Sequence, residues 1–277
     1  MRVLPPKTAY AFARLCTRAL DRAVPKLRRV AETNLRFALP ELSAEERRRL
    51  IDGVFASVAR LLADFARFPE INASNVHDVI RYEGLEHYER AKQKGRGILV
   101  ATAHLGNWEL SAFTHALMTE PMHVMVRPLD NTLIDRLVEE RRQLSGNKLI
   151  LKKDAALSVV RALKANQAVG ILIDQNTTPE EGVFIDFFGV KACAGAAFAK
   201  LASRTGAAVV PGFAFWEEAE RKYVLRFYPE IEITGDANID TQRIHSEFEW
   251  MIRQYPDQWL WIHRRWKTRP PGATSLY

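Results

Sequence analysis

The stretch from Gly97 to Ala103 constrains the fold more than any other part of the 277-residue chain. It is a short apolar run rich in branched side chains and framed by glycines, which predicts a strand buried on both faces of its sheet. Such a strand needs helices above and below it, so we expect an α/β protein. His104 follows the run directly and therefore stands at the strand's carboxyl end, where ligands collect in α/β sheets.

From residue 79 onward, short apolar runs alternate with segments of helical periodicity. This order predicts a mostly parallel central sheet flanked by helices, in one continuous unit over residues 71–277. The expected strands cover residues 79–82, 97–103, 122–126, 148–151, 168–173, 183–187, 207–215 and 223–227. The expected helices cover residues 85–94, a segment capped by Asn107, and residues 132–144, 155–166 and 196–203.

Residues 1–70 are predicted to form a helical, membrane-associating region. Residues 8–29 interleave apolar side chains with arginines and lysines, and Pro25 breaks the segment. This is the composition of an interfacial helix on anionic lipid, although a surface helix docked on the core fits it about equally well. A capping box at Ser43 then predicts a helix running toward Phe68, whose apolar positions indicate plain core.

The composition limits the classes of partner. Cys16 and Cys193 provide neither a disulfide framework nor a metal cluster, and no histidines have the spacing of a zinc site, so we expect no metal. No apolar run approaches the roughly 20 residues that span a bilayer. The net charge of +7 favours an anionic partner: nucleic acid, an acidic carrier protein or an anionic membrane surface.

Glu109 lies five residues after His104, so the two side chains share no helix face. Gly106 permits a bend and Asn107 caps a helix beginning at Trp108. Across this bend we expect Glu109 to accept a hydrogen bond from one imidazole nitrogen, which leaves the other free as a general base. Taken alone, the pair is better explained as a backbone-satisfied histidine and a glutamate that favours the helix dipole.

Other charged residues also follow expected strands. Arg127 follows residues 122–126 and Asp174 follows residues 168–173, and such strand ends converge in parallel sheets. The stretch from Trp259 to Pro270 packs aromatic residues among cations, which suits phosphates or single-stranded nucleic acid. Since no nucleic-acid-binding module is present, we expect no nucleic acid and prefer a phosphate on a lipid or carrier. No nucleophile elbow or phosphate-binding glycine loop is present, so a base that deprotonates a substrate hydroxyl is the expected chemistry.

Several blocks, in order along the chain, resemble the bacterial lipid A late acyltransferases of the glycerolipid acyltransferase superfamily. His104 to Glu109 matches the family's His-x4-Asp/Glu (HX4E) signature. The other matching blocks are Arg127-Pro128 with Asn131 and Asp135, Asp174-Gln175, residues 183–190, Val210-Pro211 and Trp261 to Pro270.

The resemblance implies that a fatty acyl group passes from acyl carrier protein, or acyl-CoA, to a hydroxyl of a lipid A precursor. We expect no cofactor beyond the acyl thioester, no metal and no covalent intermediate. His104 would be the base and Glu109 its orienting partner. The implied location is the cytoplasmic face of the inner membrane, peripheral or weakly anchored. The implied substrate-binding or supporting residues are Arg127, Asn131, Arg142, Asp174, Gln175, His263, Arg265, Lys267 and Arg269.

Two alternatives stay open at this point. An acyltransferase for another glycolipid, such as phosphatidylinositol mannoside, resembles the same core. A non-catalytic lipid- or nucleic-acid-binding protein is an alternative of another class, against which the His104 and Glu109 pair argues, because a pure binder needs no positioned base.

Overall fold

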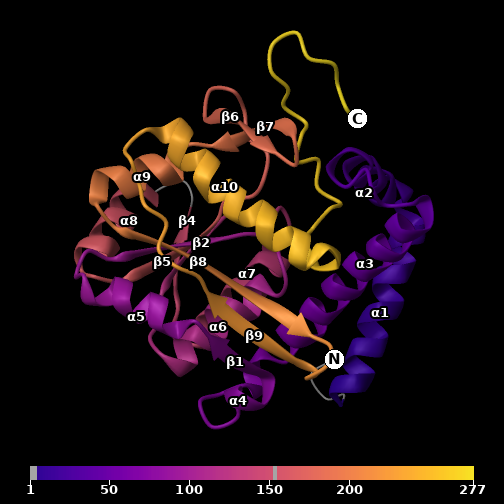
Figure 1. Ribbon diagram of the computed structural model, residues 1–277. Helices are drawn as coiled ribbons and strands as arrows, with labels where there is room; N and C mark the ends of the chain where they lie inside the picture. The colour runs from indigo at the N-terminus through magenta and orange to yellow at the C-terminus, as the bar shows by residue number, and fades with distance from the viewer. Residues whose placement is uncertain (1–4, 152–154) are drawn as a thin grey trace.

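A seven-stranded sheet forms the centre of the computed structural model, which describes residues 5–151 and 155–277 (Figure 1). The order across the sheet is β1-β9-β8-β2-β5-β3-β4, so β2 lies in the middle. β2 pairs in parallel with β5 and β8, and β3 pairs in parallel with β4 and β5. The strands are β1 (Ile80–Glu83), β2 (Ile98–Thr102), β3 (His123–Val126), β4 (Lys148–Leu151), β5 (Ala168–Leu172), β8 (Ala208–Glu217) and β9 (Lys222–Phe227).

The central strand β2 supplies side chains to both faces of the sheet, as its unbroken apolar sequence predicts. Leu99 and Ala101 belong to one buried cluster, and Ile98 and Val100 belong to the other. Because successive side chains of a strand point to opposite faces, a strand in this position must be apolar at every residue. The expected α/β fold with a mostly parallel sheet is confirmed.

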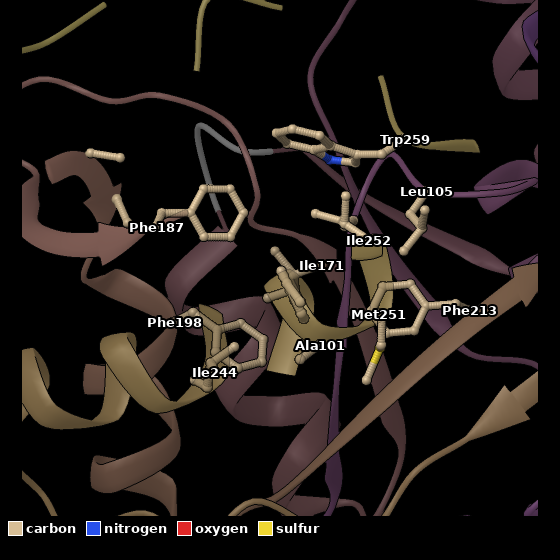
Figure 2. Packing of buried hydrophobic residues seen from close by; sticks show 14 of the residues in the cluster. Ala101, Leu105, Ile171, Phe187, Phe198, Phe213, Ile244, Met251, Ile252 and Trp259 are labelled. Atoms are coloured by element: carbon tan, nitrogen blue, oxygen red, sulfur yellow. The ribbon is translucent and has the colours of Figure 1, made fainter. Parts of the chain in front are cut away.

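Helices cover both faces. The first face is covered by α4 (Val76–Val79), α5 (Leu85–Gln93) and α6 (Trp108–Met118), and the second by α2 (Pro25–Ala38), α8 (Ala155–Lys164), α9 (Ala197–Thr205) and α10 (Ala237–Gln254). Figure 2 shows Ile244, Met251 and Ile252 of α10 among the same buried side chains as Ala101 and Ile171 of the sheet. The remaining long helices are α1 (Pro6–Ala23), α3 (Ala44–Ala66) and α7 (Thr132–Gln143).

Two parts of the fold differ from the sequence expectation, and the mostly parallel sheet contains one antiparallel pair. Helix α10 was not predicted, although Asp236 caps it and its buried residues have helical spacing. Residues 183–187 do not join the main sheet: β6 (Gly182–Phe187) pairs with β7 (Val190–Gly195) in a separate antiparallel ribbon. Strand β9 runs antiparallel to β8, because only four residues connect the two strands and so short a loop makes a hairpin.

The N-terminal helices form a layer beside the sheet, with α1 lying along α3 (Figure 1). Ser43 and Glu46 form the expected capping box at the start of α3. The contact between α1 and α3 is made by small residues, since Ala9 and Ala13 are buried against Ala59 and Ala63. The larger apolar side chains of α1 instead face outward and are exposed; they are Phe12, Leu15 and Leu20.

Within the described ranges, none of the helices combines the length and the apolar character needed to cross a bilayer. The division of the chain at residue 70 stays a prediction.

The small residues of the α1–α3 contact should tolerate no larger side chain. We expect Ala13→Leu to lower the free energy of unfolding by about 1–3 kcal/mol, because a leucine forced into a filled contact must displace its neighbours. Ala19→Leu, at an exposed position of the same helix, is the matched control and should change stability by less than about 0.5 kcal/mol. Urea denaturation of both variants measures this; equal effects would show that the contact is loosely packed.

Candidate active site

His104 lies just beyond β2, and its backbone is fixed on both sides. Its N–H donates to Asp174 Oδ2 at 3.0 Å, and its carbonyl accepts the N–H of Leu260 at 3.0 Å. Its imidazole Nδ1 lies 2.8 Å from Asp174 Oδ1. Asp174 follows β5, the parallel neighbour of β2, so the convergence of strand ends expected for these two residues is observed.

The Asp174 carboxylate is buried and receives three hydrogen bonds. Two come from the backbone N–H and the imidazole of His104, and the third comes from the indole Nε1 of Trp259 at 2.8 Å. Burial alone would raise the pKa of Asp174, but the charge of His104 and these donors outweigh it and hold the pKa well below its usual range. Asp174 is therefore ionised, and Nδ1 of His104 is the nitrogen that carries the proton.

The second imidazole nitrogen of His104 faces the outside of the molecule. Nε2 lies 3.4 Å from Nε2 of the exposed Gln175, and 17% of the His104 side chain is exposed, against 3% for Asp174. Burial lowers the pKa of His104, but the charge and hydrogen bond of Asp174, with a contribution from Glu109, give a net rise. His104 thus presents a basic nitrogen whose proton affinity is increased by two carboxylates.

The structure does not show the expected hydrogen bond between Glu109 and His104. Glu109 instead forms a bidentate ion pair with Arg142, at 2.6 Å and 2.9 Å. Burial lowers the pKa of Arg142, but its hydrogen bond to Glu109 gives a net rise. Glu109 lies in the first turn of α6 and Arg142 in the last turn of α7, so this pair joins the two helices beside the imidazole.

The bend between His104 and Glu109 is held by its backbone. Gly106 has φ +67°, and a Cβ added there would lie 2.1 Å from the carbonyl oxygen of Ala214. The side chain of Asn107 accepts the N–H of Leu110, which caps α6 as expected, and donates to Asp64 Oδ2 at 3.1 Å. Burial raises the pKa of Asp64 to about 6. Helix α3 therefore contacts the start of α6 directly.

The C-terminal stretch closes over the loop that follows β5. His263 Nε2 accepts the N–H of Asn176 at 3.2 Å, and the Asn176 side chain is bonded to both the N–H and the hydroxyl of Thr268. Burial lowers the pKa of His263, which suits a neutral ring that accepts this bond. His263 thus holds the loop of Asp174 in place.

Arg265 is fully buried. Its Nη1 donates to the carbonyl of Cys193 at 2.6 Å, and its guanidinium lies 5.2 Å from the centre of the Phe187 ring. Burial lowers the pKa of Arg265 to about 10, and the charge of Asp174 opposes that fall. The position suits a buried counter-charge to Asp174 rather than a surface contact for substrate.

The other predicted site residues lie away from the imidazole contacts. Arg127 is exposed, and Asn131 caps α7 by accepting the N–H groups of Leu133 and Ile134. Lys267 is exposed, and Arg269 donates to the carbonyl of Lys191 at 2.5 Å. These four residues are not brought together with His104 by any hydrogen bond in the described part of the chain.

Sequence reasoning missed Trp259 as a member of the site. Its indole nitrogen reaches Asp174, while its ring lies in the core cluster with Ile252 and Leu105 (Figure 2). The place of Trp259 at the start of an aromatic and cationic stretch could have indicated this role, but we interpreted that stretch as a surface that binds phosphate. In residues 5–151 and 155–277, no group of three or more histidine, cysteine, aspartate or glutamate side chains is arranged to hold a metal ion.

The amino-acid sequence that forms this site matches a known protein family. Residues 1–268 match the family model described as bacterial lipid A biosynthesis acyltransferase. The chain belongs to this family. The lipid A acyltransferase family comprises enzymes, and this protein is an O-acyltransferase.

Three curated relatives illustrate the breadth of the similarity. The chain is 32% identical to the lipid A biosynthesis palmitoleoyltransferase of Escherichia coli K12, over 95% of this chain and 87% of the relative. It is 31% identical to the lauroyltransferase of the same organism, over 90% and 82%. It is also 28% identical to the phosphatidylinositol mannoside acyltransferase of Mycolicibacterium smegmatis, over 78% and 72%.

The contact between Asp174 and His104 should be visible in the titration of His104. Removal of the Asp174 charge by Asp174→Asn is expected to lower the pKa of His104 below its wild-type value, because the protonated imidazole loses its main counter-charge. Asp186→Asn, at an exposed carboxylate paired with Lys191, is the control and should leave the titration unchanged. NMR of labelled histidine measures both, and an unshifted pKa in Asp174→Asn would contradict the assignment.

The bend at Gly106 should accept no Cβ. Gly106→Ala and Gly95→Ala both place alanine at a positive φ, which costs about 1–2 kcal/mol, but no atom lies within 4 Å of a Cβ at Gly95. We expect Gly106→Ala to be less stable than Gly95→Ala by about a further 1–3 kcal/mol because of the contact with Ala214. Urea unfolding compares the pair; equal losses would mean that the bend relaxes freely.

Proposed function

We propose that this protein transfers a fatty acyl group from an acyl carrier protein or CoA thioester to a hydroxyl of a lipid A precursor. The observation that carries the proposal is the contact of the buried Asp174 carboxylate with Nδ1 of His104, so that in the neutral imidazole Nε2 carries no proton and faces outward. The names of the two Escherichia coli relatives support the acceptor class.

The proposed reaction needs no bond between enzyme and acyl group. Nε2 of His104 takes the proton of the acceptor hydroxyl as its oxygen attacks the thioester carbonyl. The C–S bond breaks when the intermediate collapses, and the imidazolium returns the proton to the leaving thiolate. Asp174 stabilises the imidazolium between these steps, and its pKa, well below the usual range, keeps it ionised throughout.

Glu109 and Arg142 are proposed to act beside the base rather than through a hydrogen bond to it. Glu109 contributes negative charge that raises the pKa of His104, and Arg142 keeps that carboxylate in place. Gln175, whose amide nitrogen lies 3.4 Å from Nε2 of His104, places a side-chain donor beside the proposed base. We assign to it the stabilisation of the oxyanion that forms on the thioester.

The outer face of α1 supports a peripheral contact with an anionic membrane, at the cytoplasmic face of the inner membrane where the acceptor would be reached. Phe12 and Leu15 are 49% and 65% exposed on a helix that also carries Arg14, Arg18 and Arg22. Apolar side chains flanked by cations are the pattern of helices that lie in a membrane interface.

The name of one relative supports a second class of acceptor as an alternative. The similarity to the phosphatidylinositol mannoside acyltransferase of Mycolicibacterium smegmatis favours the same chemistry on another glycolipid. The base and its carboxylate would serve either acceptor, since both reactions deprotonate a hydroxyl group of a glycolipid.

The proposal is tested by an acyl-transfer assay with purified protein, acyl carrier protein and CoA thioester donors, and a lipid A precursor. We expect the acceptor to gain the mass of one acyl group. His104→Gln should lower the rate by about 10²–10⁴-fold, the usual contribution of a general base. His77→Gln, at an exposed histidine outside the site, is the matched control and should keep the wild-type rate.

Retained transfer in His104→Gln would contradict the mechanism. Transfer to a phosphatidylinositol mannoside acceptor, but not to the lipid A precursor, would keep the chemistry and replace the acceptor.

A further inference from the structure

A pocket between α1, α2 and α3 lies outside the site described above. It is lined by four arginines together with two aspartates and one phenylalanine. The lining residues are Arg14, Arg18, Asp21, Arg22, Arg28, Asp52 and Phe55. Four guanidinium groups around one hollow form a concentration of positive charge that neither the packing of the helices nor the acyl transfer explains.

Arg28 lines one side of this pocket, and ion pairs hold its side chain in place. Its guanidinium donates to Asp21 at 2.7 Å and to Asp52 at 2.5 Å, and it lies 5.7 Å from the centre of the Phe55 ring. Both carboxylates of the pocket are therefore engaged by Arg28. The charges of the other three arginines are therefore not paired with a carboxylate of the pocket.

Arg14, Arg18 and Arg22 have no ion pair among the residues that the structure describes. Moreover, Nη1 of Arg14 is buried and no protein atom in the described ranges accepts its hydrogen bond. A buried N–H without an acceptor costs about 1–3 kcal/mol, and like charges four residues apart on a helix repel one another. An anion in the pocket would relieve both costs at once.

The positions of the three arginines suit one shared anion. They are spaced by four residues on α1, so at 100° per residue they fall within a sector of about 80° of the helix surface. A phosphate group matches this arrangement, because its several oxygens accept hydrogen bonds from more than one guanidinium and pair with each in a bidentate manner.

The neighbouring surface indicates which molecule carries that phosphate. Leu15 and Phe12 follow the arginine sector around α1 and are exposed, while the opposite face, with Ala9 and Ala13, is buried on α3. An apolar face directly beside the cations would enter the acyl region of a bilayer when the cations reach the headgroups.

We propose that this pocket is a phosphate-binding site for the headgroup of an anionic membrane lipid. The inference rests on the proposed contact of α1 with a membrane, and it is independent of the acyl transfer at His104.

The test compares two triple variants of the full chain in vesicle co-sedimentation. The pocket variant is Arg14→Gln/Arg18→Gln/Arg22→Gln. The control variant is Arg36→Gln/Arg49→Gln/Arg136→Gln, which removes the same charge from three exposed arginines in surface pairs. The vesicles are phosphatidylcholine with either phosphatidic acid or oleic acid at equal surface charge, so that only the first adds a phosphate monoester.

We expect the wild type to prefer the phosphatidic acid vesicles. The pocket variant should lose about tenfold more affinity for them than the control variant, and it should bind the oleic acid vesicles as the control does. Equal losses in the two variants would overturn the proposal, because they would reduce the effect to overall charge.

Two further outcomes separate the possible failures. If the wild-type protein binds no anionic vesicle, the result contradicts the membrane contact on which the inference rests and overturns the lipid site with it. A second outcome is that inorganic phosphate stabilises the wild type but not the pocket variant, while the wild type shows no preference for phosphatidic acid vesicles. This result would overturn the lipid as the source of the phosphate and leave a site for soluble phosphate. Binding by His104→Gln should equal that of the wild type in every case, so a failure of the acyl-transfer mechanism is scored separately.

Discussion

The carboxylate of Asp174 is the group on which the rest of the site depends. A buried anion costs several kcal/mol unless donors surround it, and here three donors from two other segments of the chain do so. His104 comes from the end of β2 and Trp259 from the C-terminal stretch, so the sheet and that stretch must both be in place before the imidazole is held. Trp259, Trp261 and Trp266 are buried together, so the packing of the C-terminal stretch helps to hold the indole donor of Asp174 in place.

A second ion pair links the site to the outer helices. Glu109 and Arg142 join the start of α6 to the end of α7, and none of the residues of α7 is buried. Asp64 connects α3 to the same end of α6 through Asn107, and α3 in turn carries α1. Helices α1 and α3 are thus linked to the start of α6 by the alanine contact between α1 and α3 and by the polar contact of Asp64 with Asn107.

The amino-acid sequence predicts the elements of the site better than their partners. The apolar runs before His104 and Asp174 place both residues at strand ends, and the capping residues Ser43 and Asn107 act as expected. The partner of His104 was assigned to Glu109 because it is near in sequence. The actual partner is 70 residues away and is brought close because β5 lies next to β2, an order of strands that no local pattern encodes.

Burial was also hard to predict for the cationic residues. Arg265 and His263 stand in a stretch that alternates aromatic residues and cations, which is typical of a surface that binds phosphate, yet the fold buries Arg265 fully and uses His263 to hold a backbone N–H. The sequence of α1 fits an interfacial helix and a docked surface helix about equally well, and it does not reveal that alanines make the contact with α3. Close approach of two helices favours small residues, and the sequence does not reveal where two helices approach.

The tautomer of His104 tests the central claim most directly. In long-range ¹H–¹⁵N NMR spectra above the pKa of the imidazole, with the signal assigned by its loss in His104→Gln, we expect Nδ1 to carry the proton and Nε2 to be bare. A spectrum with the proton on Nε2 would contradict the account, because Asp174 would then not hold the ring and the outward-facing nitrogen could not act as a base.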